Sequence, residues 1–528
     1  MDTDPALLEA LAAPEMYGGA GARVQVHETH GSRVFVAGEH AYKVKKPLAL
    51  GFLDYSTLER RRAACREEVR VNRELAGDLY VGVRAIVSTP EGFAFAPDDA
   101  PDAVEYAVQM RSFREEDTLA GLIARGSLTR AHIDAVARRL ASFHRHAPAA
   151  GGGGPLKLLE RWQTNVAELA RLSPPGDWHV EVAQAFGESF VRMHAPEIER
   201  RVDSGLIRCG HGDLRCDHVL AVPSVRVVDS IEFDPALRCM DVAFDLAFLM
   251  MDLQAHGQRW AARELLAAYR DAGIDPGGAR LRSFYAAHWA IVRAKVALID
   301  AREHRDGGPG DERIEEARAR WRLGEELCWG ARGPLAIVVC GPAGSGKSTL
   351  AAELSRRSQM AILSSDVVRK RSAGLAAADR ARPELYGRQR TRATYELLGR
   401  EALLQLRRGE GAIVDATCRS HADRAPLLAQ LRQGDTRILF VRCEVPLAVA
   451  LERAARRMGD VARVSDATPE IAAEQFRSFQ ELDELPAEQV LGLDAGQPLH
   501  AQVAAVALAV DRLPAPGDGA SADGPAGG

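Results

Sequence analysis

The sequence has little of what secreted, membrane-spanning or metal-cluster proteins carry. No stretch of about 18 apolar residues lacks charged side chains. The most apolar segment of the sequence, residues 241–253, is interrupted by Asp245 and Asp252. The first residues are acidic and precede no long apolar stretch, so a secretory signal is not expected. The eight cysteines form no CxxC pair, which predicts reduced, buried thiols. These absences favour a cytoplasmic protein without a membrane partner.

An excess of charge of one sign is also missing. The 68 Lys and Arg residues nearly balance the 73 Asp and Glu residues, for a formal net charge of -5. This balance argues against nucleic acid as a partner. A length of 528 residues exceeds one ordinary core, so two or three domains are expected. Nothing in the sequence specifies an oligomeric state.

The first part of the chain is rich in strand patterns at its start and helical in pattern later. Residues 24–46 alternate polar and apolar side chains around Gly38, which predicts a β-hairpin. Residues 55–76 switch to helical spacing, and the chain from about residue 128 to 330 is mainly helical in pattern. Residues 1–330 are therefore predicted to form a small β-rich lobe followed by a larger helical lobe.

The second part alternates short apolar runs with helical segments. Continuous apolar strands separated by helices predict a parallel sheet covered on both faces. The final residues are Gly, Pro, Ala and Asp and have nothing to bury, so they are expected to be disordered. The predicted domains are residues 1–330 and 331–512, with a tail at 513–528; the predicted strands lie at 335–340, 361–366, 411–417 and 437–444.

Residues 341–349, GPAGSGKST, fit the phosphate-binding pattern G-x-x-x-x-G-K-[ST] between a predicted strand and a predicted helix. Backbone N–H groups of such a loop surround phosphates, and the positive end of the helix dipole favours them. Lys347 is expected to reach the β- and γ-phosphates of ATP, and the Ser348 hydroxyl to bind Mg²⁺. The predicted nucleotide-binding residues are Gly341, Pro342, Ala343, Gly344, Ser345, Gly346, Lys347, Ser348 and Thr349.

Three further residues extend this prediction. Asp415 ends an apolar run and is a candidate second Mg²⁺ ligand, or else a plain strand-terminal aspartate. Asp366 and Arg369 could hold the acceptor hydroxyl and a phosphate, with Asp366 in a catalytic role. The alternative for this pair is a helix cap beside a solvated arginine.

A basic segment, residues 451–467, contains the candidate lid residues Arg453 and Arg457, although a run of charge is also typical of a solvated face. With these motifs, residues 334 to about 510 resemble the P-loop kinases that include gluconate kinase, chloramphenicol phosphotransferase and polynucleotide-end kinases. The resemblance implies ATP- and Mg²⁺-dependent phosphoryl transfer to a hydroxyl. The acidic overall balance favours a small-molecule acceptor over a polynucleotide end.

Residues 209–220, CGHGDLRCDHVL, contain a His-Gly-Asp triplet that precedes an apolar strand and the helical start MDVAFDLA. Together with the strand AYKVKK and the helix at 55–76, they resemble aminoglycoside phosphotransferases, over roughly residues 24–300. That resemblance implies a bilobal α+β fold of the protein-kinase type. It also implies a catalytic Asp213, a buried bracing Asp245, and a lysine–glutamate pair formed by Lys43 (or Lys45) with Glu68 (or Glu67).

Two residues depart from the pattern of that family. His218 stands where a metal-binding asparagine is usual, and Glu232 stands at the position of the metal-binding aspartate, flanked by Asp229 and Asp234, which could substitute. Imidazole and glutamate can both ligate a divalent ion, although Mg²⁺ prefers oxygen. Two hypotheses follow for this half: an altered but active kinase, or a nucleotide-sensing pseudokinase that regulates the P-loop half.

The whole chain resembles bifunctional aminoglycoside phosphotransferase/ATP-binding proteins, through stretches such as AYKVKKPLALGFLDYSTLERRR and IEFDPALRCMDVAFDLAFLMMDL. The resemblance implies a multidomain architecture, in which a protein-kinase-like α+β domain precedes an α/β P-loop domain with a parallel sheet. It implies nucleotide binding in both halves and does not specify the acceptor.

Overall fold

The computed structural model describes residues 4–514, apart from 20–22, 30, 51–52, 175, 177, 304–309, 377–378, 380–382, 435 and 458–467. Its contacts group into two compact units, one formed by Met1–Gly154 with Glu197–Gly278 and the other by Pro155–Pro196 with Ala279–Gly528. The domain boundaries predicted from the sequence stay a prediction, because a compact unit and a domain need not coincide. Most of the predicted tail lies outside the described residues.

The first unit begins with a six-stranded antiparallel sheet in the order β1-β2-β3-β8-β6-β7. The hairpin predicted around Gly38 is confirmed, since β2 pairs with β3 and Gly38 has φ 61°. Helix α2 packs its buried face, including Cys65 and Val69, against Tyr106 and Val108 of the sheet. The elements are α1 (Pro5–Ala12), η1 (Pro14–Tyr17), β1 (Gln25–Glu28), β2 (Ser32–Ala37), β3 (His40–Lys45), β4 (Ala49–Leu50), β5 (Leu53–Asp54), α2 (Leu58–Ala76), η2 (Gly77–Leu79), β6 (Tyr80–Thr89), β7 (Gly92–Pro97) and β8 (Ala103–Arg111).

Helices and short strands complete the first unit. Helix α8 contains the most apolar segment of the sequence and is buried on nearly all sides, which explains why its apolar residues follow no single stripe. Among the described residues, no helix is both long enough and apolar enough to span a membrane. The elements are η3 (Glu115–Asp117), α3 (Leu119–Ala124), α4 (Arg130–His146), β9 (Ile207–Cys209), β10 (Val219–Leu220), β11 (Arg226–Val227), α7 (Pro235–Arg238), β12 (Cys239–Asp241), α8 (Val242–Ala255) and α9 (Arg259–Asp271).

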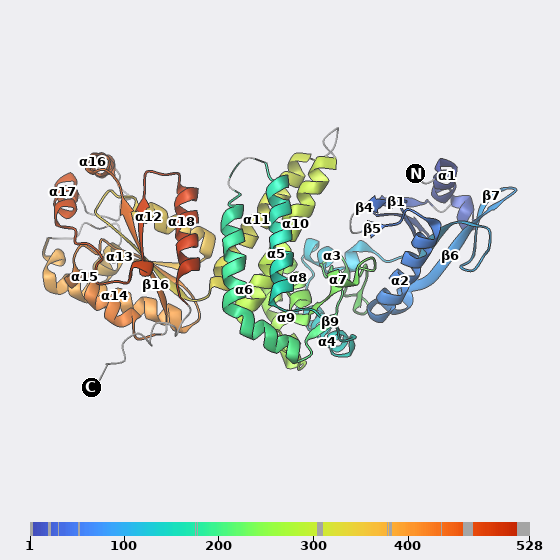
Figure 1. Cartoon of the computed structure of the whole chain (residues 1–528), viewed down its shortest axis with the longest axis horizontal. Coiled ribbons are helices and arrows are strands. Elements are labelled where there is room, and N and C mark those ends of the chain that lie inside the picture. The colour runs from blue at the N-terminus through green and yellow to red at the C-terminus, as the bar shows by residue number, and fades with distance from the viewer. Residues whose placement is uncertain are drawn as a thin grey trace. The chain divides into compact units, whose positions relative to one another are not determined.

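The second unit contains a five-stranded sheet in the order β14-β15-β13-β16-β17, and every neighbouring pair is parallel (Figure 1). The predicted α/β fold with a parallel sheet is confirmed, and β17 is a strand that the sequence analysis did not predict. The strands are β13 (Leu335–Cys340), β14 (Ala361–Ser364), β15 (Ala412–Asp415), β16 (Arg437–Glu444) and β17 (Val490–Asp494).

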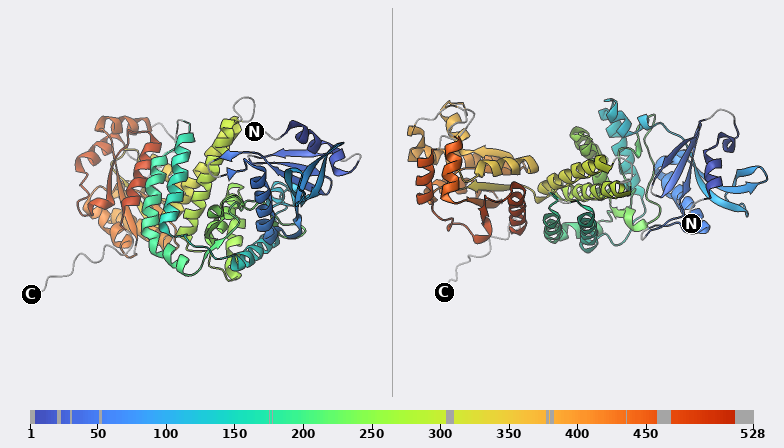
Figure 2. Two further views of the ribbon diagram at one scale, coloured as in Figure 1. Left: turned by 45° about the vertical axis from the view of Figure 1, so that its right-hand side comes forward. Right: turned by 90° about the horizontal axis from the view of Figure 1, so that it is seen from above.

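Helices cover both faces of this sheet, and long helices precede it; α10 and α11 run side by side (Figure 2). The helices are α5 (Pro155–Leu172), α6 (Val180–Asp203), α10 (Ala279–Glu303), α11 (Gly310–Arg332), α12 (Lys347–Ser358), α13 (Ser365–Ser372), η4 (Pro383–Tyr386), α14 (Arg388–Arg407), α15 (His421–Leu431), α16 (Leu447–Arg457), α17 (Pro469–Ser478), η5 (Ala487–Gln489) and α18 (Leu499–Arg512).

Alternation along β13 divides the core of the second unit in two. Leu335, Ile337 and Val339 belong to a cluster with residues of α12 and α18. Ala336 and Val338 belong to the cluster on the other face, with residues of α14 and α15. Successive side chains of a strand point to opposite faces, so a continuously apolar strand needs cover on both sides.

The P-loop sheet is joined closely to the helix before it. Helix α11 ends at Arg332 and β13 begins at Leu335, and Trp329 of α11 lies in the same core as β13. Arg332 donates two hydrogen bonds to the carboxylate of Asp511 in α18, at 2.8 and 2.7 Å, and both side chains are buried. A chain that began at residue 331 would keep the Arg332–Asp511 pair but would lose Trp329 and the rest of α11. This loss would expose the apolar core, so experiments on the P-loop half use the full chain.

The cysteine prediction is correct for six residues and wrong for two. The cysteines of the described chain that lie outside a disulfide are all buried: Cys65, Cys216, Cys328, Cys340, Cys418 and Cys443. Cys209 and Cys239 form a disulfide instead of remaining reduced. They lie directly opposite each other where β9 pairs with β12, a register that the sequence does not show.

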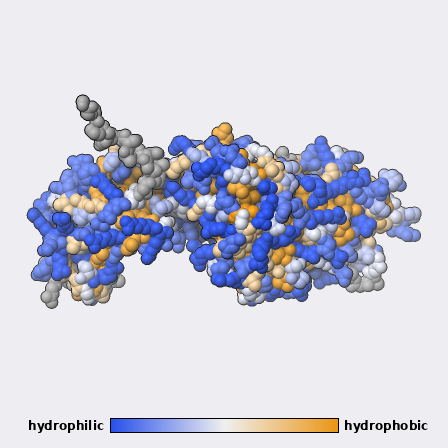
Figure 3. Space-filling view, turned by 90° about the horizontal axis from the view of Figure 1, so that it is seen from below, coloured by the Kyte–Doolittle hydropathy of each residue, from blue (hydrophilic) through white to orange (hydrophobic). Residues whose placement is uncertain are grey.

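The face drawn in Figure 3 is mostly hydrophilic, with smaller hydrophobic patches between the charged side chains. The large hydrophobic residues that are exposed in the described chain belong to separate elements, such as Val26 of β1, Leu156 of α5 and Leu404 of α14. Scattered apolar residues of this kind are normal on a protein surface and indicate no docking site.

Candidate functional site

The glycine-rich loop links β13 to α12 and requires its glycines. Gly341, Gly344 and Gly346 have φ values of 136°, 81° and 99°, which side chains other than glycine rarely adopt. A Cβ on Gly344 would also lie 2.3 Å from the carbonyl oxygen of Ala450. The backbone therefore approaches its neighbours closely and presents its amides at the amino end of α12, where a phosphate is favoured.

Ser348 and Asp415 meet beside this loop. The Ser348 hydroxyl donates a hydrogen bond to Oδ2 of Asp415 at 2.7 Å. They meet because β13 and β15 are adjacent parallel strands in which Val339 lies opposite Asp415. Hydroxyl and carboxylate oxygens are the ligands that Mg²⁺ prefers, so this donor set fits the predicted ion.

The side chain of Lys347 is folded back over the loop. Its ammonium group donates a hydrogen bond to the carbonyl oxygen of Pro342 at 2.8 Å. This contact keeps the charge within the loop that would hold phosphates. A lysine ammonium can exchange one carbonyl acceptor for phosphate oxygens without moving its backbone.

Gln475 of α17 is part of this site, although sequence analysis did not identify it. Its side-chain Oε1 accepts a hydrogen bond from the backbone N–H of Ala343 at 2.8 Å. That amide belongs to the phosphate-binding loop, so Gln475 holds a donor that a phosphate oxygen would otherwise use. The two residues are 132 positions apart in the chain, and no local pattern links them.

Replacing Gln475 with alanine is expected to tighten nucleotide binding by about 2- to 10-fold, because one net hydrogen bond of about 0.5–1.5 kcal/mol no longer competes with phosphate. The measurement is calorimetric titration of the full-length Gln475→Ala variant with ATP and Mg²⁺. Arg477→Ala on the same helix is the control, because Arg477 is exposed and its side chain donates to the Ala473 carbonyl oxygen of that helix. Weaker binding of Gln475→Ala would instead show that Gln475 contacts the nucleotide.

Asp366 and Arg369 lie on α13, at the edge of the sheet that carries the loop. Asp366 is in the first turn of α13, just after β14, whose Ser364 lies opposite Asp415. Arg369 is buried: its guanidinium donates to the Leu385 carbonyl oxygen at 2.9 Å and to the Thr391 hydroxyl at 3.1 Å. Arg369 thus joins α13 to the start of α14, and these bonds would have to exchange before it could bind phosphate.

The predicted lid is described only in part. Arg453 of α16 donates a hydrogen bond to the Ala495 carbonyl oxygen at 3.4 Å. Its Nη1 also lies 3.5 Å from the point that a Cβ on Gly346 would occupy, which places this arginine against the phosphate-binding loop. The side chain of Arg457 and residues 458–467 lie outside the described residues.

In the first unit, both candidate lysines contact one glutamate. Lys43 Nζ lies 3.0 Å from Oε1 of Glu68, and Lys45 Nζ lies 2.5 Å from Oε2. Glu67 points elsewhere and pairs with Arg70 and Arg238. Although burial alone would lower the pKa of each lysine, the neighbouring carboxylates raise both pKa values above the ordinary range, so both lysines are charged.

The two lysines lead to two different carboxylates. Lys43 pairs with Asp229 at 2.5 Å, whereas Lys45 pairs with Glu232. Tyr55 also donates a hydrogen bond to Glu232 at 2.7 Å, and Glu232 is buried. Burial would raise the pKa of both carboxyls, but Lys43 lowers that of Asp229 and Lys45 lowers that of Glu232, so both are ionised.

The His-Gly-Asp loop is held by α8. Oδ2 of Asp245 accepts the backbone N–H of His211 at 2.8 Å, and Oδ1 accepts that of Gly212 at 2.9 Å. His144 lies 3.1 Å from the same carboxylate, which is fully buried. These bonds orient the loop so that the Asp213 carboxylate remains partly exposed, as an acceptor-facing group would need.

His218 is engaged on both ring nitrogens. Nδ1 lies 2.9 Å from the Asp213 carbonyl oxygen, and Nε2 lies 2.7 Å from Nη2 of Arg215. A guanidinium only donates, so this contact assigns the acceptor role to Nε2 and the proton to Nδ1. Asp229 Oδ2 is 3.8 Å from Nε2, and Arg215 would have to withdraw before His218 could ligate a metal.

The structure therefore brings the predicted residues of the first unit together in groups that their order in the sequence did not indicate. Asp213, His218 and Asp229 lie together, with Lys43 attached to Asp229. Glu232 lies with Lys45 and Tyr55 instead and has no described contact with His218. Asp229, which the sequence analysis named as a possible substitute, is the carboxylate in position to share a cation with His218.

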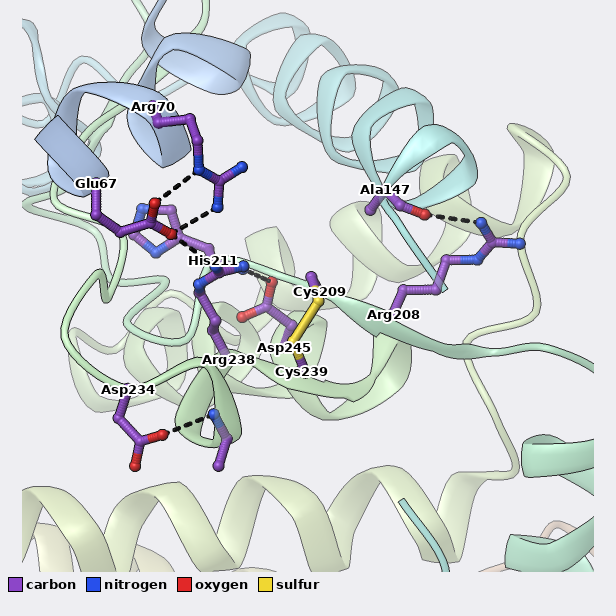
Figure 4. The surroundings of a disulfide bond; sticks show 11 residues. Glu67, Arg70, Ala147, Arg208, Cys209, His211, Asp234, Arg238, Cys239 and Asp245 are labelled. Atoms are coloured by element: carbon purple, nitrogen blue, oxygen red, sulfur yellow. Dashed lines mark hydrogen bonds and ion pairs between the residues drawn. A yellow bond between two sulfur atoms is a disulfide. The ribbon is translucent and has the colours of Figure 1, made fainter. Parts of the chain in front are cut away.

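A disulfide closes the base of the same loop (Figure 4). Cys209 precedes the loop directly and is bonded to Cys239 of β12. Between the two strands, the Gly210 N–H donates to the Arg238 carbonyl oxygen at 2.8 Å, and the Arg238 side chain reaches Glu67 of α2. The entry to the loop is thereby tied to both β12 and α2.

Comparison with known proteins identifies a family profile in the second unit. An AAA domain profile matches residues 337–482, which include the phosphate-binding loop and Asp415. Uncharacterised proteins from Mycobacterium tuberculosis and Mycobacterium bovis are 32% identical over 464 residues, covering 85% of this chain and 89% of theirs. The chain belongs to the same family as these mycobacterial proteins.

Several solved structures are each similar to one part of this chain. A gluconokinase from Sinorhizobium meliloti is 21% identical and covers 33% of the chain and 92% of its own length, with a TM-score of 0.24. A choline/ethanolamine kinase family protein from Mesorhizobium loti is 13% identical and covers 62% of the chain and 98% of its own, with a TM-score of 0.37. A putative aminoglycoside phosphotransferase from Ralstonia eutropha is 16% identical and covers 61% and 98%, with a TM-score of 0.35.

The site residues that sequence analysis did not identify share one property. Gln475, Arg215 and Tyr55 contact predicted site residues through side chains, and none belongs to a motif with a fixed spacing. Only Arg215 carries a local signal, because it lies two residues after Asp213 and three before His218.

Proposed function

We propose that this protein is an ATP- and Mg²⁺-dependent phosphotransferase, and that its P-loop half transfers the phosphoryl group to a hydroxyl of a small molecule. The observation that supports this best is the bond between Ser348 and Asp415 beside the glycine loop. It assembles a phosphate-binding backbone and an oxygen pair for Mg²⁺ at one edge of a parallel sheet.

The residues of the P-loop half have distinct roles in this proposal. Loop amides and Lys347 bind the β- and γ-phosphates, after Lys347 releases the Pro342 carbonyl and Gln475 releases Ala343. Ser348 and Asp415 would hold Mg²⁺, which, when bound, neutralises charge on the phosphates. Asp366, at the same sheet edge, orients the acceptor hydroxyl and accepts its proton.

The second candidate function concerns the first unit, as a nucleotide-binding unit that regulates the other half. The supporting observation is the contact of Arg215 with Nε2 of His218, which occupies the nitrogen that a metal would need. Lys43, Glu68 and Asp229 nevertheless keep the geometry for holding nucleotide phosphates. In this role Asp213 would not be required for turnover.

One experiment tests the first candidate and determines whether the first unit is itself catalytic. The full chain is incubated with ATP, Mg²⁺ and a pool of cell metabolites that also contains RNA 5′-ends, and new phosphorylated products are identified by mass. We expect a small-molecule product that Asp415→Asn abolishes and Asp213→Asn leaves unchanged. Loss in Asp213→Asn alone would assign the transfer to the first unit, and a labelled RNA end would replace the acceptor class.

If no pool yields a product and no ATP is consumed, the proposal of a phosphotransferase is wrong. Folding of each variant is checked by its thermal unfolding profile, so that a loss of product is not mistaken for a loss of structure.

A further inference from the structure

Three side chains of different chemistry converge at the carboxyl end of α8, on the side of the His-Gly-Asp loop. They are Cys216, Asp252 and His256, and the thiol sulfur, a carboxylate oxygen and an imidazole nitrogen all lie within 4.8 Å of one another. The proposed phosphoryl transfer uses none of these three side chains.

Local structure explains why they meet. Asp252 and His256 are four residues apart at the end of α8, so they project from the same face, and Nε2 of His256 lies 3.9 Å from Oδ2 of Asp252. Cys216 comes from the loop, and its backbone N–H donates to Asp252 Oδ2 at 2.9 Å. This bond docks the loop on the helix and brings the thiol beside the other two groups.

We propose that Cys216, Asp252 and His256 bind one zinc ion. Thiolate, carboxylate and imidazole together are ligands typical of Zn²⁺, whereas Mg²⁺ and Ca²⁺ select oxygen ligands. As the zinc–sulfur bond forms, the thiol proton leaves for solvent. The resulting thiolate and carboxylate carry two negative charges, and a divalent ion balances both at a place where the two side chains are buried.

The exposure of the three residues fits a site that a metal can enter. Cys216 and Asp252 are buried, while the His256 side chain is 38% exposed. Three protein ligands leave the fourth position of a tetrahedral ion for water, on the side of the exposed imidazole. The Cys216 N–H bond to Asp252 is the outer contact that fixes the carboxylate.

Zinc at this position would hold the loop at a second point. Asp245, near the start of α8, already binds the N–H groups of His211 and Gly212. Cys216 lies between Asp213 and His218, so a metal clip there would fix the rest of the loop to the other end of the same helix. None of the three ligands is assigned to nucleotide or acceptor binding in the proposed function.

The first test uses cobalt as a spectroscopic substitute for zinc on the reduced full chain, freed of any affinity tag. We expect one equivalent of Co²⁺ to produce a thiolate-to-cobalt charge-transfer band that zinc abolishes. Cys216→Ser should remove the band, and Cys328→Ser, which changes another buried thiol, should retain it. A band that persists in Cys216→Ser, or the absence of any band in the unmodified chain, would overturn the proposal.

The second test does not depend on a buried substitution. His256→Ala changes a partly exposed side chain, and zinc affinity measured by chelator competition should fall more than about 100-fold, since outer contacts alone are worth about 10- to 100-fold. His146→Ala, at another exposed histidine, is the matched control. Unchanged zinc affinity in His256→Ala would contradict the assignment.

A rival metal site would give a different signal. The other described cluster of this kind, His421 with Asp483 and Glu484, is exposed and contains no thiol. Metal bound there would produce no thiolate band and would be insensitive to Cys216→Ser. That result would reject Cys216 as a ligand.

Discussion

Lys347→Ala in the full chain is expected to reduce kcat for ATP consumption by about 100- to 1000-fold, the range seen when one preorganised charge-stabilising donor is removed from an active site. The Lys347 ammonium group can release the Pro342 carbonyl oxygen and place its positive charge beside the phosphates. The loop amides and the Ser348–Asp415 pair remain in the variant, so nucleotide binding should weaken less than turnover does.

The measurement is steady-state ATP consumption at saturating Mg²⁺, with nucleotide affinity measured separately. Lys157→Ala is the matched control, because Lys157 is exposed on α5 and pairs with a neighbouring exposed glutamate, Glu160. Turnover in Lys347→Ala equal to that of the control would locate the ATP chemistry outside the P-loop.

The second large effect is expected from Lys45→Met. Lys45 is the shared partner of Glu68 and Glu232, and all three side chains are buried. Its removal takes the ion-pair partner from Glu232, which keeps its hydrogen bond from Tyr55, and leaves Glu68 paired with Lys43. Breaking a buried pair from one side typically costs about 3–5 kcal/mol, so we expect the unfolding free energy of the first unit to fall by about that amount.

Lys46→Met is the matched control for this substitution. Lys46 is the next residue and pairs with Glu28, which is exposed, and such surface pairs contribute about 0–1 kcal/mol. Denaturant unfolding is followed by a probe in the first unit, since a chain of several domains need not unfold in one step. Equal stabilities of the two variants would show that the buried carboxylates need only one lysine.

The loss of unfolding free energy in Lys45→Met should depend on pH in a defined direction. In the unmodified chain Lys45 lowers the pKa of Glu232 against the effect of burial, so the pair stabilises the fold above the ordinary glutamate pKa and loses this effect as pH falls through the lowered value. In the variant, burial still raises the pKa of Glu232, and only Lys43 and the Tyr55 hydrogen bond lower it, so the ionised carboxylate is stabilised less than in the unmodified chain as pH rises. The stability difference should therefore be largest at neutral pH and shrink as pH falls below the ordinary glutamate pKa of about 4.3, through the lowered pKa of Glu232.

The phosphate-binding loop could be predicted from the sequence because its parts are contiguous. The pattern of residues 341–349 and the apolar strand before it specify the loop, its helix and the parallel sheet. The hairpin around Gly38 and helix α2 were predictable for the same reason, since alternation and helical spacing are local properties.

Several contacts depended on distant register and could not be predicted. Arg369 has the spacing of a phosphate-binding residue, yet it is buried against Leu385 and Thr391 because of how α13 packs on the start of α14. The disulfide depends on Cys209 and Cys239 lying opposite each other on β9 and β12. A shift of one residue in either strand would turn one cysteine to the other face.

The sequence by itself determined the two phosphate-binding patterns, the class of each half and the identity of most residues near each site. Only the tertiary structure decided which of these residues act together: Glu68 with both lysines, Asp229 rather than Glu232 beside His218, and Gln475 on the loop amide of Ala343. The reason is physical. A motif is read from neighbours along the chain, whereas an ion pair forms where strands and helices bring charges within a few ångströms.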